Sequence, residues 1–552
     1  MDHEHAFLQA IREEPDDDAH RLICADWLEE QGGAERTARS AFIRAQCRLA
    51  ALPPGDPGRV DLEDEAADLL AEYEREWTQP LHGIAEDWQF ARGFVESVTL
   101  RGEDFLTHAE PLFDFAPLRA VHLLVHPRDV PRLAACRFLQ YVEALNFRRC
   151  HLNDRSLQQL LTSPFLTRLK ALNFGGNSIT TAGVQSLVPS ALMGRLRRLD
   201  LSRNIGIGDK AVRLLAKAPQ AENLEVLSLA RTNTTLEGFH HLFESTTLTR
   251  LTDLNMAGAR SSWAQHAFPL RSLPESTLLR NLHRLDLSET RLPITLPALL
   301  TSPSLLNLRA LCLRNVGASS TDAEVLAESE TLMNLMTLDL RKNSLGSGGV
   351  QALAESPRLA SLTHLDVGSN NIRDPGAQAI AASPHLRNLI VLELAGNGIG
   401  GPGLQALAAS SNLDGVRTLN LASNFIGADS VRALAESPHP ARLSLLNLGD
   451  AYLEEDSARA LAGSANLVRL RTLLLPKNQL GDGGARALAQ SPHLKQLITL
   501  DLHENRIGKA GAEALAAAPY GRRLRRLDLR GNVFTDTQEA LLRDRFGDAV
   551  LL

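Results

Sequence analysis

The sequence has few cysteines and few aromatic residues, and it has no long apolar run. Five of its 552 residues are cysteines, their number is odd, and no two of them form a CxxC pair. A disulfide framework and a cysteine-based zinc site are therefore not expected. No run of 18 apolar residues occurs, and the N-terminus lacks the basic and apolar regions of a secretory signal. These absences predict a soluble protein of the reducing cytoplasm.

Leucine dominates the apolar residues, whereas aromatic residues make up only 5% of the chain. A chain of 552 residues is too long for one ordinary hydrophobic core, so it forms several domains or an array of stacked repeats. Many leucines and few large rings favour the array, because each of its layers needs only a small core of the same kind.

The net charge of −7 is divided unevenly along the chain. Residues 1–90 contain 22 Asp or Glu and 8 Lys or Arg, whereas residues 91–552 contain 43 and 50. The N-terminal segment is therefore acidic and the remainder mildly basic. This asymmetry argues against nucleic acid as a ligand of the N-terminal segment, and it permits contact between the two parts.

The pattern L-x-x-L-x-L-x-x-N recurs fifteen times, and six of the repeats have another residue in place of the Asn. The last positions of the repeats are Cys150, Asn177, Asn204, Thr232, Ala259, Thr290, Val316, Asn343, Asn370, Asn397, Asn424, Ala451, Asn478, Asn505 and Asn532. From Val316 to Asn532 the step is 27 residues eight times in succession. A period of this length is the sequence signature of a solenoid.

Each repeat predicts a short strand followed by a helix. In LRTLLLPKN the side chains of Leu470, Leu473 and Leu475 are expected to point inward, and the residue between the last two outward. The next segment, LGDGGARALAQ at 480–490, carries a helical apolar stripe that packs behind the strands. A recurring Ser-Pro pair then ends the helix, because a residue before proline disfavours the helical conformation.

The helix pattern x-G-x-x-G-A-x-x-L-A after the strand pattern, as at 500–516, resembles the ribonuclease-inhibitor-like class of leucine-rich repeats. The resemblance covers about residues 91–552. It implies an α/β fold: a right-handed, curved solenoid with a parallel β-sheet on the concave face and helices on the convex face. It also implies that the buried Asn bonds to the backbone of neighbouring repeats. The step from Ala259 to Thr290 grows to 31 residues, which is either local drift or a functional insertion.

The N-terminal segment predicts three short helices, around residues 4–14, 19–30 and 38–52. Its pattern F-L-x-A-I-x-x-x-P-D-D-D-A-x-R-L-x-x-A-D-W-L-E-E, followed by A-F-I-R-A-Q, resembles a bacterial repeat-companion domain over about residues 5–50. The resemblance implies a small all-α domain and no known activity. Asp16, Asp17 and Asp18 are expected to cap the second helix rather than bind a metal, and Leu22, Ile23 and Trp27 are expected on its apolar face.

The sequence therefore divides into five predicted segments. They are an acidic helical domain at 1–50, a linker and acidic helix at 51–90, capping repeats at 91–135, about fifteen leucine-rich repeats at 136–532 and a C-terminal cap at 533–552.

The outward position of each predicted strand gives a stripe of carboxylates and amides. Asp339, Asp366 and Glu393 fall on three successive strands, which lie about 4.8 Å apart in a parallel sheet. Three stacked like charges are mildly unfavourable, so bound cations, basic neighbours or a basic partner would relieve them.

These patterns predict a non-enzymatic scaffold that binds a protein partner on the concave face. No catalytic residue, cofactor or metal ligand is expected, and neither nucleic acid, membrane nor a small-molecule substrate is an expected partner. The expected contact residues are Asp200, Asp286, Asp339, Asp366, Glu393, Arg198, Arg284, Arg314 and Arg341. Two alternatives stay open: a GTPase-activating protein of the leucine-rich repeat type, and a functional N-terminal domain for which the repeats are a spacer.

Overall fold

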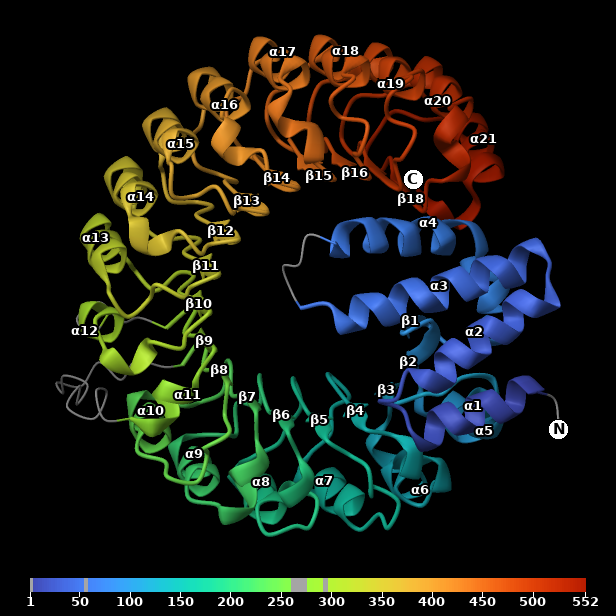
Figure 1. Cartoon of the computed structure of the whole chain (residues 1–552), viewed down its shortest axis with the longest axis vertical. Helices are drawn as coiled ribbons and strands as arrows, with labels where there is room; N and C mark the ends of the chain where they lie inside the picture. The colour runs from blue at the N-terminus through green and yellow to red at the C-terminus, as the bar shows by residue number, and fades with distance from the viewer. Residues whose placement is uncertain (1–2, 54–57, 260–275, 291–295) are drawn as a thin grey trace. The chain divides into compact units, whose positions relative to one another are not determined.

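The computed structural model describes residues 3–53, 58–259, 276–290 and 296–552. The chain forms two compact units, 1–260 and 261–552, called unit 1 and unit 2 below. The boundary between them lies inside the segment that the sequence predicts as one run of repeats. In unit 2, the strands lie on the inner side and the helices on the outer side of a stack of repeats (Figure 1).

Unit 1 begins with four helices, continues with a hairpin and then alternates strands with helices. Its helices are α1 (His3–Glu13), α2 (Ala19–Gln31), α3 (Ala34–Ala51), α4 (Arg59–Trp77), α5 (Gly102–Phe115), α6 (Val130–Ala134), α7 (Asp154–Leu161), α8 (Thr181–Leu187), α9 (Asp209–Ala216) and α10 (Leu236–Phe243). Its strands are β1 (Asp87–Ala91), β2 (Phe94–Arg101), β3 (Ala120–Leu124), β4 (Ala144–Asn146), β5 (Ala171–Asn173), β6 (Arg198–Asp200), β7 (Val226–Ser228) and β8 (Asp253–Asn255).

Unit 2 alternates strands and helices throughout. Its helices are α11 (Thr277–Asn281), α12 (Leu296–Leu300), α13 (Ser320–Glu328), α14 (Gly346–Glu355), α15 (Arg373–Ala382), α16 (Gly401–Ala408), α17 (Ala428–Glu436), α18 (Glu455–Gly463), α19 (Gly481–Ala489), α20 (Lys509–Ala516) and α21 (Asp536–Phe546). Its strands are β9 (Arg284–Asp286), β10 (Ala310–Cys312), β11 (Thr337–Asp339), β12 (His364–Asp366), β13 (Val391–Glu393), β14 (Thr418–Asn420), β15 (Leu445–Asn447), β16 (Thr472–Leu474), β17 (Thr499–Asp501), β18 (Arg526–Asp528) and β19 (Val550–Leu551).

The strands pair in parallel with their neighbours in each unit. In unit 2 the register from β10 to β18 joins each residue to the residue 27 positions later, as in Leu338 with Leu365. In unit 1 the strands β2 to β8 also pair in parallel, with registers of 23 to 28 residues, but β1 runs antiparallel to β2. The predicted leucine-rich repeat fold and its N-terminal all-α region are confirmed, whereas the sequence did not predict the hairpin strand β1.

The cores of the repeats contain the predicted side chains. Leu470, Leu473 and Leu475 are each fully buried, and so is the helical stripe of Ala485, Leu488 and Ala489. The residue between the inward leucines of β16 is partly exposed, as expected. Burial of these leucines stabilises each layer by roughly 1.5–3 kcal/mol per side chain.

The expected bonding of the buried Asn to neighbouring repeats is also confirmed. The amide group of Asn397 donates to the carbonyls of Val367 and Leu394, and its oxygen accepts from the backbone N–H of Asn370. One side chain thus satisfies backbone groups of two repeats. Where Thr232 replaces the Asn, its hydroxyl donates to the carbonyl of Leu229.

A second ladder joins the repeats at the ends of the helices. The hydroxyl of Ser383 donates to the carbonyl of Ala354 in the preceding repeat at 2.5 Å, and its oxygen accepts from the backbone N–H of Leu386. The same bond to the preceding repeat is made by Ser245, Ser329, Ser356, Ser410, Ser437, Ser464 and Ser491. The Ser-Pro pairs, interpreted from the sequence as helix stops, therefore also bond neighbouring repeats together.

The N-terminal helices, called the head below (α1–α4), pack directly on the hairpin and the first repeats of unit 1. Phe94 of β2 is buried in a cluster with Ile11, Cys24 and Ile43. Phe90 of β1 joins a second cluster. The hairpin therefore belongs to the core of the head as well as to the sheet.

Ion pairs strengthen this contact. Arg21 of α2 is fully buried and donates to the carboxylate of Glu96 in β2. Arg119 pairs with Asp16 of the head and with Glu143 of the next repeat, each at 2.8 Å. The acidic head thus meets basic side chains of the array, a contact that the charge asymmetry permitted.

Two expectations for the second helix of the head differ in outcome. Asp17 accepts from the backbone N–H of Ala19 at 2.8 Å, so one of the three aspartates caps α2 as predicted. Leu22 and Ile23 were wrongly placed on its apolar face, because they are 38% and 53% exposed, whereas Trp27 is partly buried and packs against the core of the head. The buried face instead carries Arg21, Cys24, Ala25 and Leu28.

The irregular segment of the array lies largely outside the described residues. The predicted linker at 52–58 and the segment between Ala259 and Thr290 fall partly at 54–57 and 260–275. In the described part of unit 2, the C-terminal segment forms the expected helix and strand, α21 and β19.

Candidate functional site

The outward face of β9–β13 in unit 2 carries most of the charged residues that the sequence singled out. Asp339, Asp366 and Glu393 stand side by side, because β11, β12 and β13 pair at these positions. The side chains of Asp339 and Asp366 are only 15% and 16% exposed. We call these three residues the carboxylate triplet.

One arginine partly compensates the triplet. Arg341, two residues after Asp339, places Nη2 at 2.8 Å from Asp339 and Nε at 2.9 Å from Asp366. It therefore sits between the first two carboxylates, and the predicted relief by a basic neighbour is met for that pair. The hydrogen bonds that Arg341 donates to Asp339 raise the pKa of Arg341, so this arginine stays charged.

The corresponding position in the next repeat is Gly368, so no arginine stands between Asp366 and Glu393. Gly368 itself donates its backbone N–H to Asp366 at 3.0 Å. Burial nevertheless raises the pKa of Asp366 to about 7, with the charges of Asp339 and Glu393 acting in the same direction. The positive charge of Arg341 is thus too little to keep the pKa of Asp366 at its usual value.

The strands before the triplet are more basic. Arg284 on β9 is exposed and lies 3.8 Å from the sulfur of Cys312, the outward residue of β10. Asp286 accepts from the backbone N–H of Ser288, and Arg314 is half-buried with its Nε atom unbonded. Asp286, Cys312 and Asp339 are neighbours on the paired strands β9, β10 and β11. The region around Arg284 and Arg314 is therefore continuous with the carboxylate triplet.

The two remaining predicted contact residues lie in unit 1. Arg198 and Asp200 are on β6, with Arg198 exposed and Asp200 partly buried. Asp200 accepts from the backbone N–H of Ser202 at 2.8 Å, which is a turn within its own repeat.

The C-terminal end of unit 2 holds another charged group on the outward face. Asp501, His503 and Asp528 bring three possible metal-ligand atoms within 4.8 Å of one another. Asp528 is fully buried, and Arg526 and Arg530 hold it at 3.3 and 2.5 Å. The hydrogen bonds from Arg530 keep the pKa of Asp528 below its usual range in spite of burial. These bonds favour an ion-pair cluster over a metal site.

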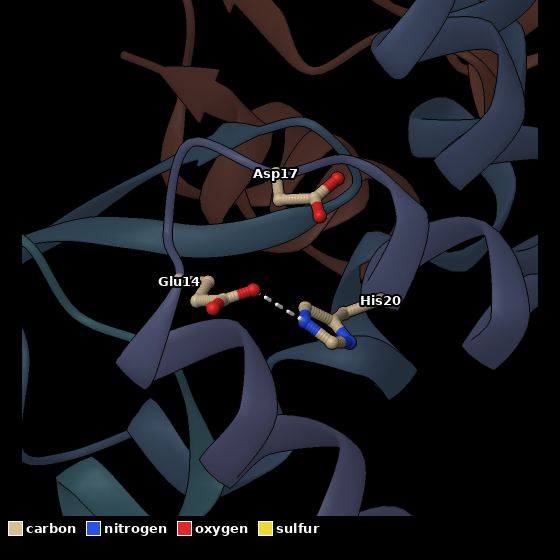
Figure 2. Close-up of side chains that lie close together, drawn as sticks. All are labelled: Glu14, Asp17 and His20. Atoms are coloured by element: carbon tan, nitrogen blue, oxygen red, sulfur yellow. Dashed lines mark hydrogen bonds and ion pairs between the residues drawn. The ribbon is translucent and has the colours of Figure 1, made fainter.

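A second group of three possible ligands lies in the head. Glu14, Asp17 and His20 surround the turn between α1 and α2, and His20 bonds to Glu14 at 3.1 Å (Figure 2). This group was not predicted from the sequence, because only the turn brings His20 beside Glu14. Asp17 and Glu14 are exposed, and Asp17 already caps α2, so the group is explained by local structure.

An exposed aromatic pair was not predicted from the sequence. The rings of Phe425 and Tyr452 stack at a centroid distance of 5.8 Å, and the residues are 65% and 62% exposed. Both follow the Asn position of their repeats. The two aromatic residues lie one repeat period apart in a chain that has few aromatic residues, and this spacing could have indicated the pair from the sequence.

The thiols of Cys24 and Cys312 are buried. Burial raises the pKa of both Cys24 and Cys312 to about 11, so each stays a protonated thiol at neutral pH. In the described part of the chain no helix is long and apolar enough to cross a membrane.

A family model described as Leucine Rich repeat matches residues 166–188, 331–354, 358–381, 385–408 and 491–516. No curated protein matches the chain. Among solved structures, an internalin of Listeria monocytogenes is 20% identical, with 77% of this chain and 94% of that chain covered and a TM-score of 0.33.

Two further structures are similar at the same level. The Rad7 and Elc1 complex of yeast gives 21% identity, coverage of 64% and 85%, and a TM-score of 0.43. A leucine-rich repeat protein of Leptospira interrogans gives 19% identity, coverage of 75% and 91%, and a TM-score of 0.39. At these scores none of the three bears on the partner or activity of this chain. The matched repeats, together with the strand and helix periodicity of both units, support a leucine-rich repeat fold for this chain.

Proposed function

We propose that the chain is a non-enzymatic scaffold that binds a protein partner through the outward face of β9–β13 in unit 2. The bound segment of the partner is basic and places an arginine between Asp366 and Glu393. The expected contacts on either side are Asp339, Arg341, Asp286, Arg284 and Arg314.

The observation that carries this proposal is the unequal compensation of the carboxylate triplet. Arg341 occupies the gap between Asp339 and Asp366, but Gly368 stands at the matching position of the next repeat. The gap between Asp366 and Glu393 has the same strand spacing and no cation from the described residues. A guanidinium there would repeat the geometry of Arg341 and make charge-assisted bonds to two carboxylates.

The outward face of unit 2 continues beyond the proposed contact on β9–β13. Its ten strands from β9 to β18 span about 43 Å at the usual spacing of parallel strands, so a bound partner can extend along it. A standard interface needs about 800 Å² on each partner. The leucine-rich repeat architecture supplies such a surface without specialised loops.

The test uses the full-length chain as bait, because the head shares a core with β1 and β2 and cannot be cut away cleanly. We expect Asp366→Asn with Glu393→Gln to lose partners that the wild-type chain recovers in a quantitative pulldown. A matched control removes two exposed carboxylates on helices, Asp429→Asn with Glu513→Gln, and should keep them.

A third variant addresses the alternative in which the head is the functional element. Asp26→Asn with Glu29→Gln removes two exposed carboxylates of α2 that pair with Arg44. Loss of the same partners from this variant, with retention by the triplet variant, would contradict the proposal. Stimulated hydrolysis of GTP by a recovered GTPase would instead favour the GTPase-activating alternative.

A further inference from the structure

The head contains a pocket that neither the repeats nor the proposed scaffold role explains. Its volume is about 370 Å³, within the range of small-molecule sites. It is lined by residues of α1, α2 and α3, the end of α4, β2 and the end of α5, all in unit 1. Apolar walls come from Trp27, Leu28, Trp77, Phe94 and Phe115.

Arg39 of α3 reaches this pocket through a cage of aromatic rings. Its guanidinium carbon lies 4.6 Å from the ring centre of Trp77, 5.3 Å from Phe90 and 5.5 Å from Phe94. A fourth ring, that of Phe42, lies at 5.8 Å. The rings fix the plane and position of the guanidinium through cation–π contacts.

No carboxylate of the described residues bonds to this cation, and Glu4 and Glu35 act on it only at longer range. Nη1 of Arg39 is buried without a hydrogen-bond partner, and among the described residues no hydrogen bond or ion pair to its guanidinium is found. Burial lowers the pKa of Arg39 to about 10, so the group still carries its charge at neutral pH. A buried charge without a counterion is costly unless something pairs with it.

The surroundings select the kind of anion. Glu4, Glu35 and Glu76 line the pocket and are exposed to solvent, so they repel a ligand with several negative charges. A single carboxylate matches the fork of one guanidinium. The aromatic and aliphatic walls match an apolar body attached to that carboxylate.

We infer that the head binds a small monocarboxylate with an apolar body, its carboxylate paired with Arg39 and its body packed between Trp27, Trp77 and Phe94. The pocket belongs to unit 1 and the carboxylate triplet to unit 2, and the inference does not depend on the proposed scaffold role. It runs against the sequence-based expectation that the chain takes no small molecule.

The experiment measures binding of hexanoate to the full-length chain by calorimetry and by the fluorescence of the pocket tryptophans. Hexanamide has the same body without the charge, and inorganic phosphate has charge without the body. We expect hexanoate to bind with a dissociation constant of the order of 1 mM. Hexanamide and phosphate should each bind at least about tenfold more weakly, because each lacks one of the two required contacts.

Variants assign the contact. Arg39→Met should weaken hexanoate binding about tenfold or more, since it keeps the length of the side chain and removes the charge. Arg48→Met, an exposed arginine of the same helix outside the pocket, should bind as the wild type does. Circular dichroism checks that both fold.

If Arg39→Met does not fold, Arg39→Lys replaces it: the charge remains and the fork is lost, so hexanoate should bind detectably more weakly. Equal binding of hexanoate and hexanamide by the wild type would overturn the inference, as would equal binding of hexanoate by wild type and the Arg39 variant. Failure of the wild type to bind hexanoate would show that Arg39 is held by its aromatic cage alone.

Discussion

The ion pair between Arg21 and Glu96 allows a quantitative test of how the head is attached to the array. Arg21 is fully buried and Glu96 is 8% exposed. The variant Glu96→Gln leaves Arg21 with Asp18 at 3.9 Å as its nearest carboxylate. Breaking a buried pair in this way costs about 3–5 kcal/mol of the free energy of unfolding.

The reverse variant, Arg21→Met, should cost less. Glu96 then keeps Arg119 at 3.8 Å, so its charge is not left without a partner. In the double variant no unpaired buried charge remains. We therefore expect its cost to fall at least about 2 kcal/mol below the sum of the two single costs.

Urea denaturation followed by tryptophan fluorescence measures these energies for the head itself. Trp27, Trp77 and Trp88 all lie in the head or the adjoining hairpin, and Trp263→Phe in every protein removes the remaining signal. Because the chain has two units, only the transition of the head is analysed. A cost below about 1 kcal/mol for Glu96→Gln, or additive single costs, would refute the view that this pair joins head and array.

Three further outcomes are expected. Burial raises the pKa of Asp366 from 3.8 to about 7, so the folded state holds a proton that the unfolded state has lost, and stability falls as pH rises between these values. Asp366→Asn should remove this fall, which is at most about 4 kcal/mol, in urea titrations at several pH values. Ser383→Ala should lower the free energy of unfolding of unit 2 by about 1–3 kcal/mol, because the carbonyl of Ala354 loses its donor. Cys24 and Cys312 should react with iodoacetamide only in urea, as mass spectrometry of the labelled native chain would show.

Each of these has a result that contradicts it. A pH dependence unchanged by Asp366→Asn would mean that its carboxylate titrates normally. An effect of Ser383→Ala no larger than that of the exposed Ser411→Ala would remove the serine ladder from the stability of the array. Rapid labelling of either thiol in the native chain would show that its environment opens readily.

The fold was predictable because its determinants are local and repeated. The inward leucines, the Asn and the helical stripe recur at one period, and each repeat packs mainly on its neighbours. The packing between repeats was harder to predict from the sequence. Ser383 was interpreted only as a helix stop, because its hydrogen bond to Ala354 depends on how closely the two helices approach, which the sequence does not give.

The candidate site was predictable only in outline. Alternation along a strand placed Asp339, Asp366 and Glu393 outward on neighbouring strands, but not the position of the Arg341 side chain between two of them. The burial of Asp528 and the aromatic cage of Arg39 depend on residues from several elements. No pattern within one repeat or one helix contains that information.

The position of Gly368 gives the most direct test of the proposed partner contact. An arginine introduced there, Gly368→Arg, would extend between Asp366 and Glu393 as Arg341 does between Asp339 and Asp366. A Cβ at Gly368 meets the carbonyl of Ala395 at 3.2 Å, so the backbone must move by a few tenths of an ångström, and its φ needs no glycine.

We expect Gly368→Arg to fold and to weaken partner binding at least about tenfold, because the chain then supplies the cation that the partner would bring. Ala422→Arg places the same charge at the matching position two repeats further on, beside Asn420 rather than a carboxylate, and should bind normally. The comparison is made with the affinity of the recovered partner for each full-length variant. If both variants lose binding equally, bulk or charge on the face is responsible, and the gap between Asp366 and Glu393 is not where the partner's arginine binds.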